Sequence, residues 1–202
     1  MINKDMRNTI FATEQEFNRE VVRFLREKLK SIDNKTIKVI GGYESDASDN
    51  YILRDFSFFK TKDGEWKLYG GAQEIDVIIY EQTIPREKLI GDFVKTTGVM
   101  VRGNIIVPAI IMELKKATRR TTSKLSNFPS HDAISANVIS GDIKRLFPKV
   151  KAMFAFDNFE GHSKAEESIS FRRMLYHFDY ICLNWENEKE NMWSDIRNWL
   201  KI

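Results

Sequence analysis

The sequence predicts an α/β protein in which a mixed central sheet is covered by helices. Two observations favour this fold. One amphipathic helical pattern precedes several apolar, β-branched runs, and the second half of the chain alternates helical and strand-like patterns. The chain has 202 residues, of which 42% are hydrophobic, and this is enough for one domain with a sizeable core. We therefore expect a single domain over residues 1–202.

The first predicted element is a helix over residues 13–30. Thr13 is a suitable N-cap, and Glu16 follows it at the spacing of a capping box. Apolar residues recur at helical spacing and form one face: Phe17, Val21, Val22, Phe24, Leu25 and Leu29. A helix with one such face covers a core and leaves its opposite face to solvent.

Short strands and turns are predicted after this helix. Residues 35–42 contain a β-branched run that ends in two glycines, and a polar loop follows at residues 44–50. An Asp-Gly pair lies between the apolar runs 56–60 and 65–69, which is a good signal for a β-hairpin. The chain between residues 35 and 69 is therefore expected to form antiparallel strands.

Two further strands frame a segment without a clear pattern. Residues 74–80 are β-branched and bounded by turn residues, which predicts a strand. Residues 105–116 are more apolar, as is typical of a strand in the centre of a sheet. Residues 83–104 between them fit neither pattern, and residues 117–130 form a polar loop.

The second half of the chain alternates helices and strands. Ser130 is a candidate cap, and Pro148 a stop, for a helix over residues 131–147. The remaining elements follow in alternating order: a strand at residues 150–156, a helix at 164–176, a strand at 180–185 and a helix at 189–200. The order of all elements is thus helix, several antiparallel strands, helix, strand, helix, strand and helix.

Charge and cysteine content exclude several classes of protein. Lys and Arg number 32 against 29 Asp and Glu, and a net charge of +3 says little about partners. The one cysteine, Cys182, excludes an intramolecular disulfide framework and a cysteine-based zinc site. The beginning of the sequence lacks the apolar core of a signal peptide, and the longest apolar stretch, residues 105–112, is too short to cross a bilayer. We expect a soluble, intracellular, cytoplasmic protein with no membrane partner.

Common enzyme motifs are absent from the sequence. It has no Gly-rich phosphate loop and no Gly-x-Ser-x-Gly elbow. The three histidines, His131, His162 and His177, lack the spacing of metal ligands. Cys182 lies in an apolar run, which favours a packing role over a nucleophilic one.

Acidic residues interrupt two of the predicted apolar strands. Asp76 lies within residues 74–80, and Glu113 and Lys115 lie within residues 105–116. Side chains alternate along a strand, so Glu113 and Lys115 share one face. A carboxylate in such surroundings is costly to desolvate unless it is paired or binds a cation. Asp76 beside Glu113 on an adjacent strand would concentrate negative charge, which a Mg²⁺ ion would relieve.

These residues resemble the PD-(D/E)xK nuclease superfamily, in which an Asp precedes a Glu-x-Lys motif on the next long strand. Here the motif is Asp76 followed by Glu113-Leu114-Lys115. The superfamily contains restriction endonucleases, Holliday-junction resolvases, and repair and phage nucleases. The surroundings are similar too, because the predicted order over residues 13–185 resembles the restriction-endonuclease-like αβββαβ core.

The sequence departs from the superfamily pattern at two places. Ile75 stands where the motif has proline, which is a common variation. The stretch between Asp76 and Glu113 is longer than a tight hairpin needs, so residues 83–104 are expected to be an insertion.

The resemblance implies a Mg²⁺-dependent deoxyribonuclease that hydrolyses DNA phosphodiester bonds, with Mn²⁺ as a substitute metal. Asp76, Glu113 and the backbone carbonyl of Leu114 would hold the metal. Lys115 would lie beside the attacking water, where it lowers the pKa of that water or stabilises the developing negative charge. Endonuclease action of the restriction or repair type is favoured because the chain carries no motor or clamp module. Many relatives cut both strands as homodimers, although no residue here identifies a dimer face.

The superfamily often adds a glutamate from the first helix. On a helical wheel Glu14 lies inside the apolar stripe and Glu20 borders it, so either is a candidate for the site. The alternative for each is a solvated helix charge.

The segment after the motif is basic. It contains no acidic residue between positions 114 and 131, and its hydroxyl residues are interspersed with cations. Basic side chains and hydroxyls contact phosphates without reading sequence. The predicted DNA contacts are Lys116, Arg119, Arg120 and Lys124, and the alternative is a solvated loop.

Two other functions remain open at this point. A catalytically inactive nuclease-fold protein could serve as a nucleic-acid-binding or assembly subunit, but such a scaffold has no reason to retain buried acids and a lysine. An unrelated α/β enzyme lacks any positive motif.

Overall fold

The computed structural model describes residues 11–43, 52–60, 62–64, 66–73, 75–85, 92–95, 104–116, 130–158 and 175–202. The helices in this part of the chain are α1 (Glu14–Ser31), α2 (Ser130–Leu146) and α5 (Trp185–Leu200). The strands are β1 (Lys38–Gly41), β2 (Ile52–Lys60), β3 (Trp66–Gln73), β4 (Val77–Ile84), β5 (Asp92–Lys95), β6 (Ile105–Lys115), β7 (Lys151–Phe156) and β8 (Tyr180–Cys182).

The centre of the molecule is a mixed sheet of five strands in the order β1-β4-β6-β7-β8. Strands β1, β4 and β6 are antiparallel neighbours, whereas β6, β7 and β8 run parallel to one another. The parallel connection from β6 to β7 passes through α2, as a crossover between parallel strands requires. The predicted α/β fold with a mixed sheet is confirmed.

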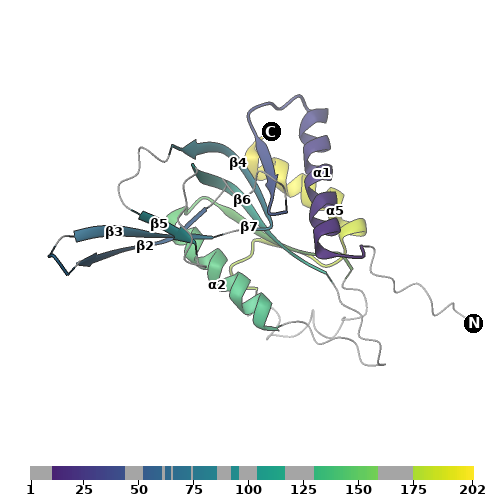
Figure 1. Cartoon of the computed structure of the whole chain (residues 1–202). Helices are drawn as coiled ribbons and strands as arrows, with labels where there is room; N and C mark the ends of the chain where they lie inside the picture. Colours follow the sequence, from purple (N-terminus) through teal and green to yellow (C-terminus); the bar gives the residue numbers. More distant parts are fainter. Residues whose placement is uncertain are drawn as a thin grey trace, which may run out of the picture.

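Helices cover both faces of this sheet (Figure 1). One face packs on α1 and α5, and its central strand contributes Ile110, Met112 and Leu114. The other face packs on α2, and Ile111 of the same strand belongs to that second cluster, together with Ile143 of the helix. Successive residues of β6 therefore enter opposite cores, which is why this strand is apolar on both sides.

A second, smaller sheet has the order β2-β3-β5 and projects from the main body (Figure 1). β2 and β3 are the antiparallel hairpin that the Asp-Gly pair predicts, and Gly64 in its turn has a φ of 85°, which favours glycine. β5 pairs in parallel with β3. The segment at residues 83–104 thus contributes the end of β4 and, through β5, an edge of this second sheet.

Helix α1 begins as the sequence predicts. The amide of Glu16 donates to the Thr13 hydroxyl at 3.0 Å, and a Glu16 carboxylate oxygen accepts from the Thr13 amide at 3.3 Å. This is a complete capping box. It fixes the first turn of α1, which lies beside the end of β6.

Two predicted boundaries near the C-terminal end of the sequence are wrong. Strand β8 ends at Cys182 rather than at residue 185, and α5 begins at Trp185 rather than at residue 189. The Asn184 side chain accepts from the Asn187 amide at 3.2 Å and caps α5. The apolar Trp185 therefore belongs to the first helical turn, where it is buried against Phe17 and Phe24.

Other predictions have mixed outcomes. Cys182 is buried, as its apolar surroundings predict. The predicted loop at residues 44–50, residues 117–129 of the predicted loop 117–130, and residues 164–174 of the predicted helix 164–176 lie outside the described residues. Ser130 is the first residue of α2, and residues 175 and 176 form a turn. None of the described helices is long and apolar enough to cross a membrane.

Candidate active site

Asp76 lies immediately before β4 and is held by three other elements. Its backbone carbonyl accepts hydrogen bonds from the Gly42 amide, just after β1, at 2.8 Å, and from the Asn18 side chain of α1 at 2.6 Å. Its Oδ2 atom accepts from the Leu114 amide of β6 at 2.8 Å. The backbone and the carboxylate of Asp76 are therefore both fixed.

The strand register places Asp76 beside Glu113. Val77 of β4 pairs with Met112 of β6, and Ile78 pairs with Ile111. One step beyond the last pair, Asp76 is opposite Glu113, and residues opposite each other in a sheet share a face. The structure thus brings together the two acids that the sequence motif suggested.

Lys115 lies within reach of two carboxylates. Its Nζ atom is 3.2 Å from Oε1 of Glu113 and 3.2 Å from Oε1 of Glu14, the first residue of α1. The Lys115 side chain is only 20% exposed, so water screens these charges less than it does at an open surface. We call Asp76, Glu113, Glu14 and Lys115 the acidic cluster.

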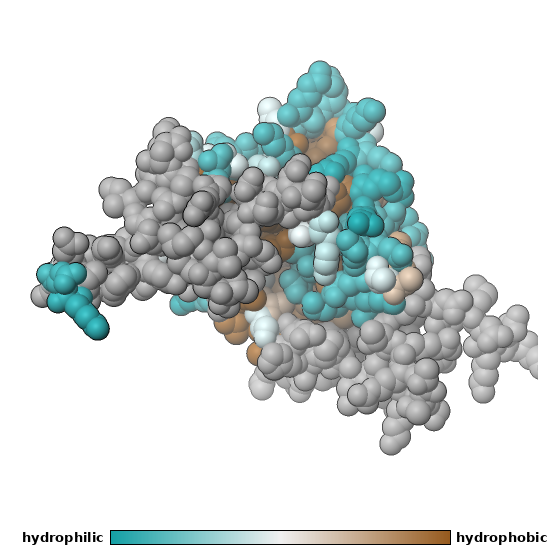
Figure 2. Space-filling view, in the orientation of Figure 1, coloured by the Kyte–Doolittle hydropathy of each residue, from teal (hydrophilic) through white to brown (hydrophobic). Residues whose placement is uncertain are grey.

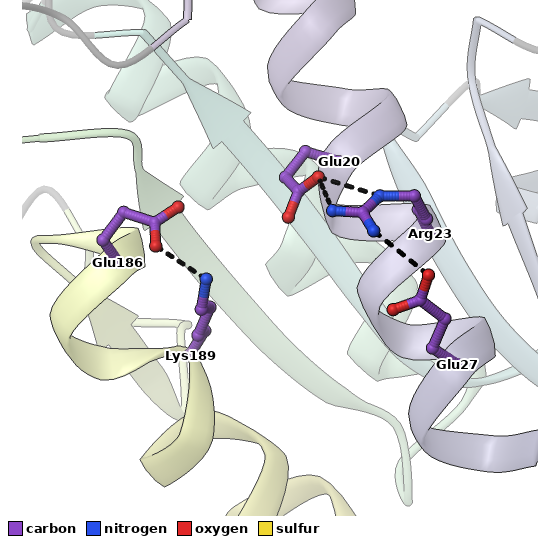
Figure 3. A network of polar contacts seen from close by, with 5 residues as sticks. All are labelled: Glu20, Arg23, Glu27, Glu186 and Lys189. Atoms are coloured by element: carbon purple, nitrogen blue, oxygen red, sulfur yellow. Dashed lines mark hydrogen bonds and ion pairs between the residues drawn. The ribbon is translucent and has the colours of Figure 1, made fainter. Parts of the chain in front are cut away.

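Glu20, the other candidate on α1, does not join this cluster. Its carboxylate accepts from Nε of Arg23 at 3.1 Å, and the same arginine reaches Glu27 at 3.1 Å (Figure 3). The pair Glu186–Lys189 on α5 is drawn in the same view (Figure 3). Of the two glutamates left open by the helical wheel, Glu14 is the one that contacts the motif.

Burial dominates the electrostatics of the cluster. It raises the pKa of Asp76 to about 6, although the Leu114 amide and the Lys115 ammonium act in the opposite direction. It also raises the pKa of Glu113 to about 7, with a further increase from the negative charge of Asp76. For Lys115 burial opposes the charged form, but Glu113, Glu14 and Asp76 outweigh it and raise the pKa. Lys115 is therefore positively charged at neutral pH.

The cluster offers oxygen ligands to a divalent cation. No set of three or more His, Cys, Asp and Glu side chains arranged to hold a metal occurs within the described ranges. Mg²⁺ does not need such a set, because it binds through one or two carboxylates and keeps several waters. Asp76 and Glu113 could supply two such carboxylates.

A third oxygen is available from the backbone of β6. The Leu114 amide points toward Asp76, and the N–H and C=O of one residue in a strand point to the same side. The Leu114 carbonyl therefore faces the same gap between β4 and β6. Two carboxylates and a carbonyl fit the preference of Mg²⁺ for oxygen ligands.

Asn18 is a residue of this site that sequence reasoning missed. It is 1% exposed and lies among the apolar residues of α1. A Cβ atom on Gly41 would come within 2.6 Å of the Asn18 Oδ1 atom, so the close approach of α1 to β1 requires glycine there. A polar residue within an apolar helical stripe was the available signal.

The predicted DNA contacts fall mostly beyond the described part of the chain. Arg119, Arg120 and Lys124 lie outside the described residues. The Lys116 ammonium donates to the Ala12 carbonyl, next to the start of α1. Lys116 thus lies near the acidic cluster without being a member of it.

No protein-family model matches the chain, and no curated protein matches it at a significant level. The acidic cluster itself therefore carries the functional inference.

Proposed function

We propose that this protein is a Mg²⁺-dependent deoxyribonuclease of the PD-(D/E)xK type, acting as an endonuclease. The observation that carries the proposal is the convergence of Asp76, Glu113 and Lys115 from two adjacent strands. The order of elements also supports it. Apart from β2, β3 and β5, which form the second sheet, the elements have the order of an αβββαβ core: α1, the antiparallel strands β1, β4 and β6, then α2 and β7.

In this proposal each residue of the cluster has a distinct task. Asp76, Glu113 and the Leu114 carbonyl hold the cation, which supplies Lewis acidity and an activated water when bound. Lys115 stabilises the negative charge that develops on the phosphate oxygens. Glu14 keeps the Lys115 ammonium at the site through its ion pair. Hydrolysis breaks the bond from phosphorus to the 3′ oxygen and leaves a 5′-phosphate.

One observation favours a second candidate function. Lys115 already pairs with both Glu113 and Glu14 at 3.2 Å, so the cluster is partly neutralised without a metal. A nuclease fold used only as a DNA-binding or assembly subunit could keep such a cluster for stability. Loss of a partner from these partly buried ion pairs would be destabilising, which would also maintain the cluster.

The deciding experiment is a cleavage assay on supercoiled, linear and branched DNA, with Mg²⁺, with Mn²⁺ and with EDTA. The proposal expects nicked and linear products from supercoiled DNA in either metal and none in EDTA. Lys115→Ala, with folding checked by circular dichroism, should remove the activity. Lys149→Ala is a matched control, because Lys149 is exposed and remote from the cluster in sequence. DNA binding without cleavage of any substrate would favour the inactive subunit.

A further inference from the structure

A basic groove lies beside the edge strand β1. It has a volume of about 1240 Å³ and is lined by α1, β1 and the turn between them. Five lining residues are cationic: Arg19, Arg26, Lys30, Lys35 and Lys38. One lining residue, Asp33, is acidic, so the charged groups of the lining sum to five minus one, or +4. The whole chain carries only +3, so positive charge is concentrated at this groove. Hydrophilic side chains cover the outer surface of α1 (Figure 2).

The cations of this groove form an ordered row. Arg19, Arg26 and Lys30 follow one another at spacings of seven and four residues, which places them along one side of α1. The row spans about 17 Å at about 1.5 Å per residue, equal to about five nucleotides of one DNA strand. The guanidinium of Arg26 donates to the Val39 carbonyl at 2.8 Å and so lies over the edge of β1.

Asp33 does little to neutralise the groove. It pairs with Lys35 at 3.4 Å, and the two side chains are 85% and 84% exposed. An ion pair with this exposure is weak, because water and salt screen it. The positive potential of the groove is therefore available to an anionic partner.

One end of the groove approaches the acidic cluster at Tyr43. Tyr43 lines the groove, and it follows Gly42, whose amide donates to the Asp76 carbonyl at 2.8 Å. Burial raises the pKa of Tyr43, and the charges of Asp76 and Glu14 raise it further, as expected for a hydroxyl near those carboxylates. Tyr43 thus belongs to the groove and adjoins, in sequence, the residue that contacts Asp76.

We propose that this basic groove binds the phosphate backbone of DNA on one side of the bond to be cut and guides it to the acidic cluster. The inference rests on the proposed nuclease function, and it adds a substrate-binding surface that the sequence motif does not contain. Contacts of this kind fix the position of the strand and read no sequence. The groove should therefore bind all DNA sequences alike.

The first test measures the salt dependence of binding to a 20-base-pair duplex, in Ca²⁺ so that turnover does not interfere. The variant Arg19→Gln/Lys30→Gln/Lys38→Gln removes three positive charges from the groove. It leaves Arg26 in place, because Arg26 donates a hydrogen bond to the Val39 carbonyl of the protein. The slope of log K against log salt should fall by about 2.7, and binding at 0.15 M salt should weaken by about 10²-fold. The matched control, Lys62→Gln/Lys149→Gln/Lys201→Gln, removes three exposed charges elsewhere. Equal slopes for the two triple variants would overturn the inference.

The second test locates the DNA directly. Cys182 is the only cysteine of the chain and is buried, so Lys38→Cys adds one accessible thiol to the groove. A duplex whose backbone phosphate carries a tether ending in an activated aryl disulfide should react with this variant by thiol–disulfide exchange, which forms the protein–DNA disulfide and releases the aryl thiol. Lys149→Cys is the control, and equal disulfide yields at the two positions would count against the groove.

Failure of this inference can be told apart from failure of the nuclease proposal. Suppose that the wild-type protein cuts DNA and the groove variant keeps its DNA affinity and its salt slope. The groove then does not bind DNA, and the nuclease proposal is unaffected. Suppose instead that no metal supports cleavage, while the groove variant loses DNA binding and Lys38→Cys forms the disulfide. The groove then binds DNA, and the nuclease proposal is contradicted.

Discussion

The amide of Leu114 donates a hydrogen bond to Oδ2 of Asp76 at 2.8 Å. This bond joins the two parts of the motif, because Leu114 lies between Glu113 and Lys115 on β6. A carboxylate held in this way can lose its charge without losing its position, since an amide oxygen accepts the same bond. Charge and geometry at Asp76 can therefore be tested separately.

Asp76→Asn is expected to raise the melting temperature of the metal-free protein at pH 8 and to abolish its response to Mg²⁺. The substitution removes a buried negative charge next to Glu113 and keeps an acceptor for the Leu114 amide. Thermal melts with Mg²⁺ and with EDTA provide the measurement. An undiminished Mg²⁺ response in Asp76→Asn would place the cation elsewhere.

The free energy of unfolding should depend on pH in a direction set by two partly buried acids, Asp76 and Glu113. Their pKa values in the folded protein, about 6 for Asp76 and about 7 for Glu113, lie above those of the unfolded chain. The folded state then binds more protons, so this contribution to stability is present below about pH 4 and is lost as the pH rises through 6 to 7. Urea unfolding without metal should show a fall between pH 5 and pH 8, and Mg²⁺ should restore stability mainly at pH 8.

Glu113→Gln tests the source of that pH dependence. It should flatten the fall in unfolding free energy between pH 5 and pH 8, because it removes the group with the higher pKa. Glu186→Gln serves as a control, since Glu186 pairs with Lys189 at the surface. Identical pH profiles for wild type and Glu113→Gln would contradict the assignment.

Lys115→Ala should reduce cleavage by at least about 10²-fold and leave DNA binding in Ca²⁺ largely intact, because it removes a charge needed in the transition state. Lys116→Ala should keep most of the cleavage, since Lys116 contacts the Ala12 carbonyl rather than the acids. Gel assays of supercoiled DNA, together with binding titrations, measure both effects. An inactive Lys116→Ala with an active Lys115→Ala would mean that the motif is misplaced by one residue.

Glu14→Gln and Glu20→Gln should behave differently although both glutamates lie on α1. Glu14 pairs with Lys115, whereas Glu20 pairs with Arg23. Loss of the Glu14 charge should weaken cleavage and shift its pH profile to lower pH, because one of the charges that raise the pKa of Glu113 is gone. Glu20→Gln should leave both the rate and the profile unchanged, and a shift caused by Glu20→Gln alone would reverse the assignment.

Asn18→Ala is expected to lower the free energy of unfolding by about 1–3 kcal/mol, because it leaves the Asp76 carbonyl with one hydrogen bond fewer in a buried place. It should also raise the Mg²⁺ concentration needed for half-maximal stabilisation, since Asp76 would be less firmly held. Melting temperatures over a Mg²⁺ titration report both effects. Loss of stability with an unchanged Mg²⁺ midpoint would reduce Asn18 to a purely structural residue.

The sequence was sufficient for the parts of the site that depend on strand alternation. Glu113 and Lys115 share a face because they are two residues apart. The approach of Asp76 to Glu113 depends instead on the pairing of β4 with β6, whose last pair, Val77 and Met112, lies one residue from the two acids. The choice between Glu14 and Glu20 depends on which turn of α1 lies over the end of β6. A helical wheel has no information about that, because it describes direction around the axis and not position along it.

Packing between distant segments explains what sequence patterns missed. Trp185 continues an apolar run that resembles a strand, but the Asn184 cap and the contact with Phe17 make it the start of α5. Asn18 looks like an isolated polar residue in an apolar stripe until the Asp76 carbonyl, 58 residues away in sequence, is placed beside it. The role of Asn18 thus depends on a tertiary neighbour that no local pattern contains, whereas the Asn184 cap is a local signal for the start of α5.

The ion pairs of Lys115 affect how the chain folds when no metal is bound. A lysine shared by Glu113 and Glu14 acts as a built-in cation, present from the moment the chain folds. Some small metal-binding domains, by contrast, fold only when their metal is bound. We therefore expect this chain to fold with Glu113 and Glu14 held by Lys115, without the need for a bound ion.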